Sequence, residues 1–120
     1  MFTPQLTQTL AKLEAVPLRI ESATWECQRL DSIQWSFPRT YIKIDIEGVE
    51  PEALRGASQV LRRYQPVLAV CTYHRSDHLW QISNLVHLIS SQCHLVLRRY
   101  AEDCWEGVCY AIPPHRLKIA

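Results

Sequence analysis

The sequence predicts an α/β fold with one domain, and three observations support this prediction. After residue 40, short apolar runs alternate with segments of helical periodicity, in the order strand, helix, strand, helix, strand, strand. The chain has 120 residues, which suffice for one core but not for two. The last two predicted strands are joined by a short polar link, so they must pair antiparallel. We therefore expect parallel strands with helices, completed by a terminal antiparallel hairpin.

The first part of the chain, residues 1–23, predicts an N-terminal helix and a linker. Thr3 followed by Pro4 is a typical helix start, and leucines then recur at helical spacing until Pro17. Residues 18–30 contain β-branched and aromatic side chains among polar ones. This composition indicates an extended segment or an edge strand before the main α/β unit.

The centre of the chain predicts a strand, a tight turn and a helix. Residues 41–46 are rich in isoleucine, three carboxylates surround Gly48, and Pro51 opens a helical pattern that Pro66 ends. Glutamates near the helix start and arginines near its end both favour the helix macrodipole. The apolar run 67–73 then predicts a strand that is covered on both faces. Together these segments form a right-handed βαβ crossover.

A second helix and a hairpin complete the predicted fold. The helix is expected to start at Ser76 or Asp77 and to present a leucine-rich apolar side as far as Ile89. Residues 94–100 and 105–112 predict the two strands of the hairpin.

Composition and charge favour a soluble, cytoplasmic protein. The net charge is +1 with histidines neutral, so nothing predicts binding to nucleic acid or to an anionic membrane. We interpret Arg98 and Arg99 as solvent-facing residues of an outer strand. No apolar run reaches the roughly 18 residues of a membrane helix, and no secretory leader is evident. The five cysteines are odd in number and lie among apolar residues, which is typical of reduced cytosolic thiols.

Several stretches of the sequence resemble one known family. Residues 41–50 read YIKIDIEGVE, and residues 54–57 and 66–69 read LRGA and PVLA. Over residues 24–117 the chain resembles the FkbM-type S-adenosylmethionine-dependent methyltransferases. Its strand order resembles the C-terminal half of a class I, Rossmann-like methyltransferase sheet. Further matching stretches are Leu30-Asp31, Tyr73-His74, Leu97 to Tyr100, Trp105-Glu106 and Tyr110 to Pro113.

The resemblance implies transfer of a methyl group from S-adenosylmethionine, usually to a hydroxyl oxygen, by in-line attack on the sulfonium methyl group. The acceptor would be a small molecule or a glycan. Members of the family hold the cofactor with a glycine-rich loop after the first strand of the sheet. This chain has three glycines, and none lies in a strand, loop and helix pattern before residue 41. We therefore expect residues 24–117 to be a partial methyltransferase domain that is inactive by itself.

An alternative is a non-catalytic remnant or interaction module. Without further strands, one flank of the strand at residues 41–46 would be unpaired, and such edges pair with another chain. Self-association through this edge is therefore expected.

The candidate catalytic residues follow two neighbouring strands. Asp45 and Glu47 end the first strand and His74 follows the next, so all three are expected at the sheet edge where α/β proteins bind ligands. By the resemblance, the carboxylates orient an acceptor hydroxyl or take its proton, and His74 serves as general base or substrate anchor. Plain structural roles remain open: Asp45 as a turn cap, Glu47 and Glu50 at the helix dipole, and His74 bonded to backbone. For Glu50 the structural role is favoured.

No metal site is expected from the sequence. Cys71, His74 and His78 have a spacing that would suit zinc, but Cys71 lies within a buried-looking strand and no fourth ligand is near. An EF-hand is excluded, because Lys43 and Leu54 would occupy the first and last ligand positions of the loop.

Overall fold

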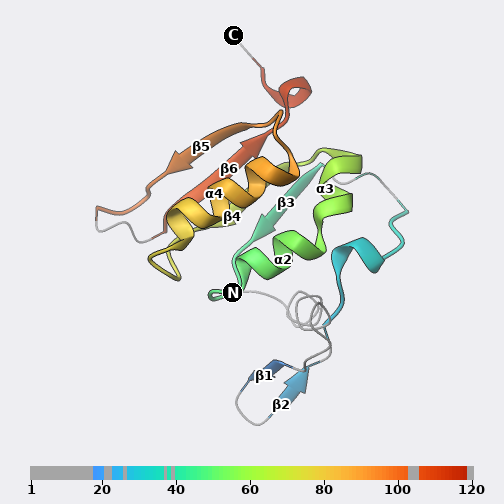
Figure 1. Ribbon diagram of the computed structural model, residues 1–120, viewed down its shortest axis with the longest axis vertical. Coiled ribbons are helices and arrows are strands. Elements are labelled where there is room, and N and C mark those ends of the chain that lie inside the picture. Colours follow the sequence, from blue (N-terminus) through green and yellow to red (C-terminus); the bar gives the residue numbers. More distant parts are fainter. Residues whose placement is uncertain are drawn as a thin grey trace.

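The computed structural model describes residues 18–20, 23–25, 27–36, 38, 40–102 and 106–118. It confirms the mixed α/β class, with a four-stranded sheet and three α-helices in the described part of the chain (Figure 1). The predicted helix after Thr3 lies outside the described residues. The strands of the sheet are β3 (Tyr41–Ile44), β4 (Val67–Cys71), β5 (His94–Arg98) and β6 (Val108–Ile112), in the spatial order β3-β4-β6-β5.

The strand directions agree with the predicted topology. β3 and β4 are parallel, with Tyr41 opposite Val67 and Ile44 opposite Val70. β6 is antiparallel to both of its neighbours, β4 and β5. The hairpin strands are shorter than the sequence predicted, and residues 103–105 of their link lie outside the described part. The parallel pair therefore directs the ends of β3 and β4 toward the same edge of the sheet.

Three helices cover one face of the sheet, as Figure 1 shows: α2 (Glu50–Gly56), α3 (Ser58–Tyr64) and α4 (His78–Ile89). Their apolar sides and the alternate residues of the strands form the main core. At its centre Ile44, Leu54 and Ile82 are at most 1% exposed. Removal of such side chains from water is the main favourable contribution to the free energy of folding of this core. None of the described helices is long and apolar enough to cross a membrane.

The single helix predicted between Pro51 and Pro66 is wrong, because the helix breaks at Ala57 into α2 and α3. The new start of α3 is capped from a distant part of the chain. Asp31, in the 3₁₀ helix η1 (Leu30–Ser32), accepts hydrogen bonds from the backbone N–H of Gln59 at 3.1 Å and of Val60 at 2.9 Å. An aspartate there satisfies amides that a helix start leaves without partners. Periodicity along one segment cannot reveal a cap that comes from elsewhere.

The segment before the α/β unit contains a small hairpin. β1 (Leu18–Ile20) and β2 (Ala23–Trp25) pair antiparallel as a separate two-stranded sheet. This confirms the extended segment predicted for residues 18–30, although only part of it is strand.

The second face of the main sheet carries a smaller apolar cluster and no helix among the described residues. Ala69, Cys71 and Val108 are buried there, with Tyr73 and Tyr110 packed against them. Tyr41 is 56% exposed on β3. The two faces of the sheet thus differ sharply in coverage.

Candidate functional site

The turn between β3 and α2 is held in an unusual backbone conformation. Glu47 and Gly48 have φ angles of 59° and 107°, both in the left-handed region. A Cβ atom at position 48 would lie 4.0 Å from His74 and Arg75, so there is space for a side chain. The conformation, rather than close packing, therefore requires glycine there. Strain at a non-glycine residue such as Glu47 is typical of functional sites.

Glu50 forms the inner layer of the site, directly behind this turn. Its side chain is fully buried. One carboxylate oxygen accepts the backbone N–H of Ile46 at 3.1 Å, and the other accepts that of Gly48 at 3.0 Å. Glu50 therefore ties the turn to the start of α2, which is more than the helix-dipole role that the sequence favoured.

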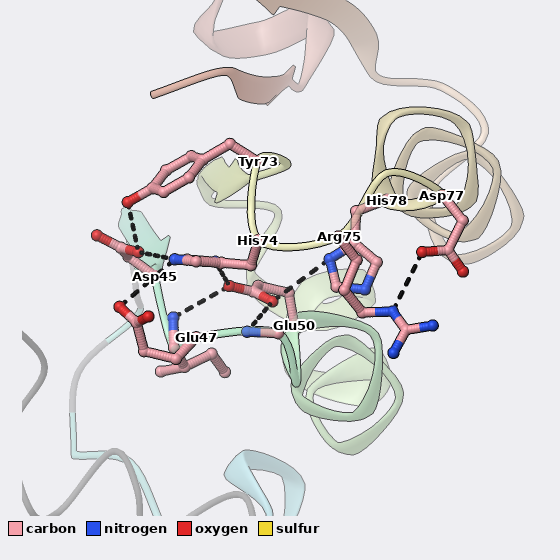
Figure 2. Close-up of polar contacts among 10 residues, drawn as sticks. Asp45, Glu47, Glu50, Tyr73, His74, Arg75, Asp77 and His78 are labelled. Carbon is pink, nitrogen blue, oxygen red and sulfur yellow. Dashed lines mark hydrogen bonds and ion pairs between the residues drawn. The ribbon is translucent and has the colours of Figure 1, made fainter. Parts of the chain in front are cut away.

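His74 leaves the end of β4 and lies between Glu50 and the two other carboxylates (Figure 2). Its Nδ1 lies 2.5 Å from Oε1 of Glu50, which makes Nδ1–H the donor to a carboxylate. Its Nε2 lies 3.4 Å from Oδ1 of Asp45 and 3.5 Å from Oε1 of Glu47. The side chain is only 8% exposed, and the buried Nε2 makes no hydrogen bond.

Asp45 and Glu47 form the outer layer and are open to solvent. Their side chains are 29% and 67% exposed. The hydroxyl of Tyr73 donates a hydrogen bond to Asp45 at 3.4 Å. The structure thus brings together all three residues that the sequence proposed as catalytic, and their catalytic role remains a prediction.

The electrostatic environment of the outer layer is negative. Burial, followed by the charge of Asp45, raises the pKa of the Cys71 thiol to about 12, and Lys43 opposes this less strongly. Burial and Asp45 likewise raise the pKa of Tyr73 to about 12. Arg75 donates a hydrogen bond to Asp77 at 3.1 Å. In Cys71 and Tyr73 burial is the larger cause of the raised pKa, and the charge of Asp45 adds to it.

The zinc spacing of Cys71, His74 and His78 does not assemble a ligand set. Among the described residues, the donor atoms that lie within 4.8 Å of one another belong to Asp45, Glu47 and His74. His78 is buried, with Nδ1 3.6 Å from Oε2 of Glu50, so it belongs to the inner layer.

Two pockets adjoin the site and meet at Tyr73. One, of about 320 Å³, is lined by Asp45 and by tyrosines that include Tyr41 and Tyr110. The other, of about 440 Å³, is lined by Tyr73 together with Arg98 and Arg99. These arginines are exposed, as the sequence indicated, but they also border a concave surface.

Sequence reasoning did not predict that Glu50 holds both the turn and the ring of His74. Its hydrogen bonds to Ile46 and Gly48 span four residues or fewer, so the tight turn was a usable signal. The burial of its carboxylate could not be predicted from the sequence, because it depends on the packing of His74 and α4 over the turn.

Comparisons with known proteins give two findings. The model of the methyltransferase FkbM domain matches residues 10–102. The chain is also similar to the crystal structure of methyltransferase FkbM from Methylobacillus flagellatus KT, with 32% sequence identity and a TM-score of 0.69. The similarity covers 79% of this chain and 25% of that one, so this chain spans about a quarter of the length of that protein. No curated protein matches the chain.

Proposed function

Since the chain belongs to the FkbM methyltransferase family, as its motifs predicted, we propose that it forms the acceptor side of an S-adenosylmethionine-dependent O-methyltransferase. The acceptor would be a hydroxyl group of a small molecule or a glycan. One observation carries the proposal: a buried, unbonded Nε2 of His74 faces Asp45 and Glu47 where β3 and β4 end. Ligands of α/β sheets bind at this edge.

The geometry supports distinct roles for the inner and outer layers. Glu50 holds Nδ1–H of His74, which leaves Nε2 to accept the proton of an acceptor hydroxyl. Asp45 orients that hydroxyl, and Glu47 lies on the solvent side of the bound acceptor. Glu50 is a positioning residue, because it acts through His74.

The tyrosine-lined pocket beside Asp45 supports a ring-shaped acceptor. Tyr41, Tyr73 and Tyr110 present aromatic rings and hydroxyl groups around about 320 Å³. Apolar or aromatic walls with a few polar groups are typical of small-molecule sites. A sugar or an aromatic ring would fit this chemistry.

The described residues do not fit the methyl donor itself. A cofactor with a carboxylate and an amine needs close backbone approach, usually from a glycine-rich loop. The glycine of the site, Gly48, has its N–H taken by Glu50. We therefore propose that the donor is held by residues other than those described, and that the chain alone does not transfer methyl groups.

The direct test is a chimera in which residues 40–118 replace the matching segment of the Methylobacillus flagellatus protein. Radiolabelled S-adenosylmethionine and a panel of hydroxyl-bearing sugars and phenols would serve as substrates. We expect methyl transfer that His74→Ala lowers at least about 100-fold, as for loss of a general base. Equal transfer by a folded His74→Ala chimera would contradict the role of His74. Calorimetric titration of the chain alone with S-adenosylmethionine should give no saturable heat.

A second candidate function is an interaction module that pairs with another copy or another chain. Within the described residues β3 has one neighbour in the sheet, so its other edge is unpaired. Unpaired edges with exposed aromatic residues such as Tyr41 favour strand addition. Sedimentation analysis decides: dimers or larger species support this role, and a clean monomer argues against it.

A further inference from the structure

The outer layer gathers three potential metal ligands from two segments of the chain. One oxygen of Asp45, one oxygen of Glu47 and one ring nitrogen of His74 all lie within 4.8 Å of one another. Acidic clusters alone are common on protein surfaces. The imidazole of His74 distinguishes this one, because it is 92% buried and points into the cluster (Figure 2).

The nitrogen that faces the cluster has no hydrogen-bond partner. Nδ1 of His74 is engaged by Glu50, so the ring is fixed and only Nε2 is directed at Asp45 and Glu47. Around Nε2 lie two carboxylate oxygens at 3.4 Å and 3.5 Å, with no hydrogen-bond geometry to either. A buried ring nitrogen beside two carboxylate oxygens is favourable only when a positive species lies among them, and a bound cation would supply that charge.

The separations match those of atoms that share one ion. Two ligands that are each about 2.1 Å from a metal at a tetrahedral angle lie about 3.4 Å apart. The distances of Nε2 from the oxygens of Asp45 and Glu47 are close to this value. No large movement of the chain is therefore needed for binding.

We propose that Asp45, Glu47 and Nε2 of His74 bind a divalent transition-metal ion of the Mn²⁺ or Zn²⁺ type. Carboxylates suit Mn²⁺ and imidazole suits Zn²⁺, so the mixed set favours these ions over Ca²⁺. Glu50 supplies the outer carboxylate that fixes the ring of a metal-binding histidine. Because Glu47 is 67% exposed, a coordination position stays open to solvent or to an acceptor oxygen.

The binding site does not depend on the proposed function, but its role in methyl transfer does rest on it. There the ion would hold the acceptor hydroxyl and lower its pKa, and the hydroxyl proton would pass to solvent water. His74 would then act as a ligand, in place of the base role proposed above for the metal-free site. A titration without methyl donor or acceptor tests the site by itself, and its outcome is independent of whether the chain takes part in methyl transfer.

The experiment is a Mn²⁺ titration of the purified chain, followed by electron paramagnetic resonance of the free ion. We expect one ion per chain, displaced by added Zn²⁺. His74→Ala and Asp45→Asn should each weaken binding at least tenfold, and Glu50→Gln by about 10- to 100-fold through loss of ring orientation. Asp77→Asn is the matched control, because its carboxylate engages Arg75 outside the cluster, and it should bind as tightly as the unaltered chain.

Two results would overturn the proposal. One is the absence of saturable Mn²⁺ binding by the folded chain. The other is binding by Asp45→Asn within twofold of the unaltered chain. Circular dichroism establishes that each variant is folded, and if His74→Ala is not, Asp45→Asn and Glu47→Gln decide the question.

Discussion

Glu50 and Asp45 lie on opposite sides of the same imidazole, yet their surroundings differ completely. Glu50 is fully buried, and both of its oxygens accept backbone N–H groups. Asp45 is 29% exposed, and its oxygen faces Nε2 of His74 without a hydrogen bond. The inner carboxylate is satisfied by the fold itself. The outer one accepts a single long hydrogen bond, from the hydroxyl of Tyr73, and with Glu47 it is open to solvent.

This difference shows that neighbouring carboxylates in one cluster can have different roles. Burial of a carboxylate is tolerated only when donors surround it, and the left-handed turn at Gly48 supplies those donors. Once the inner layer has fixed the ring of His74, Nε2 can face the outer carboxylates without a hydrogen bond. The following changes test this division, from the largest expected effect to the smallest.

Glu50→Ala should have the largest effect on stability. It leaves the N–H groups of Ile46 and Gly48 and Nδ1 of His74 without their partner, and we expect a loss of about 3 kcal/mol or more. Chemical denaturation measures the change. Glu52→Ala is the matched control in the same helical turn. The buried Oε2 of Glu52 makes no hydrogen bond, so its removal should cost at most the weak dipole contribution of about 1 kcal/mol. Equal losses in both variants would remove the distinction between the two carboxylates.

Asp31→Ala tests whether stability and the site can be separated. The substitution removes the cap of α3, and we expect a loss of about 1–2 kcal/mol. Since Asp31 does not belong to the cluster, Mn²⁺ affinity should not change. Ser32→Ala, which removes only a hydrogen bond to the carbonyl of Arg29, is the control. A weakened ion affinity in Asp31→Ala would show that the site depends on the whole fold instead of on Glu50.

Alkaline pH should destabilise the chain through Cys71. Its pKa is raised from 9.0 to about 12 in the folded chain, so the folded state keeps a proton that the unfolded state releases. The stabilisation is complete below pH 9 and is lost as pH rises toward about 12, by at most about 1.4 kcal/mol per pH unit. Denaturation at several pH values, compared with Cys71→Ala, isolates this contribution. An identical pH dependence in the variant would refute it.

Asp45→Asn should have the smallest effect on stability, within about 0.5 kcal/mol, because an open carboxylate without strong hydrogen bonds contributes little. The same change should lower the pKa of Cys71 and of Tyr73, since the charge of Asp45 raises both. Thiol alkylation rates and the ultraviolet titration of tyrosine report these shifts. A loss of stability as large as that in Glu50→Ala would place Asp45 in the inner layer.

The sequence predicted the parts of the fold that depend on neighbouring residues. The parallel unit around residues 41–73 and the closing hairpin follow from apolar periodicity and from the short link between the last strands. The edge position of Asp45 and His74 follows from that topology. The cap by Asp31 was not predictable, because it joins segments 28 and 29 residues apart.

The layering of the site also escaped prediction, for a physical reason. The sequence favoured a structural role for Glu50 alone, but it did not show that this carboxylate is buried, because the packing of His74 and α4 over the turn separates Glu50 from the exposed Asp45 and Glu47. Burial is a property of the assembled sheet and helices, so no local pattern around residue 50 encodes it.

The most direct test of the two-layer account is a nuclear magnetic resonance spectrum of the chain with substoichiometric Mn²⁺. The account predicts selective broadening of the backbone amides of Ile46, Gly48 and His74, because a paramagnetic ion in the outer layer lies next to them. Broadening should decrease with distance from the cluster and be weaker in β5, which lies at the far edge of the sheet. Uniform weak broadening, or broadening centred elsewhere, would contradict the claim that the inner layer holds His74 ready for a ligand.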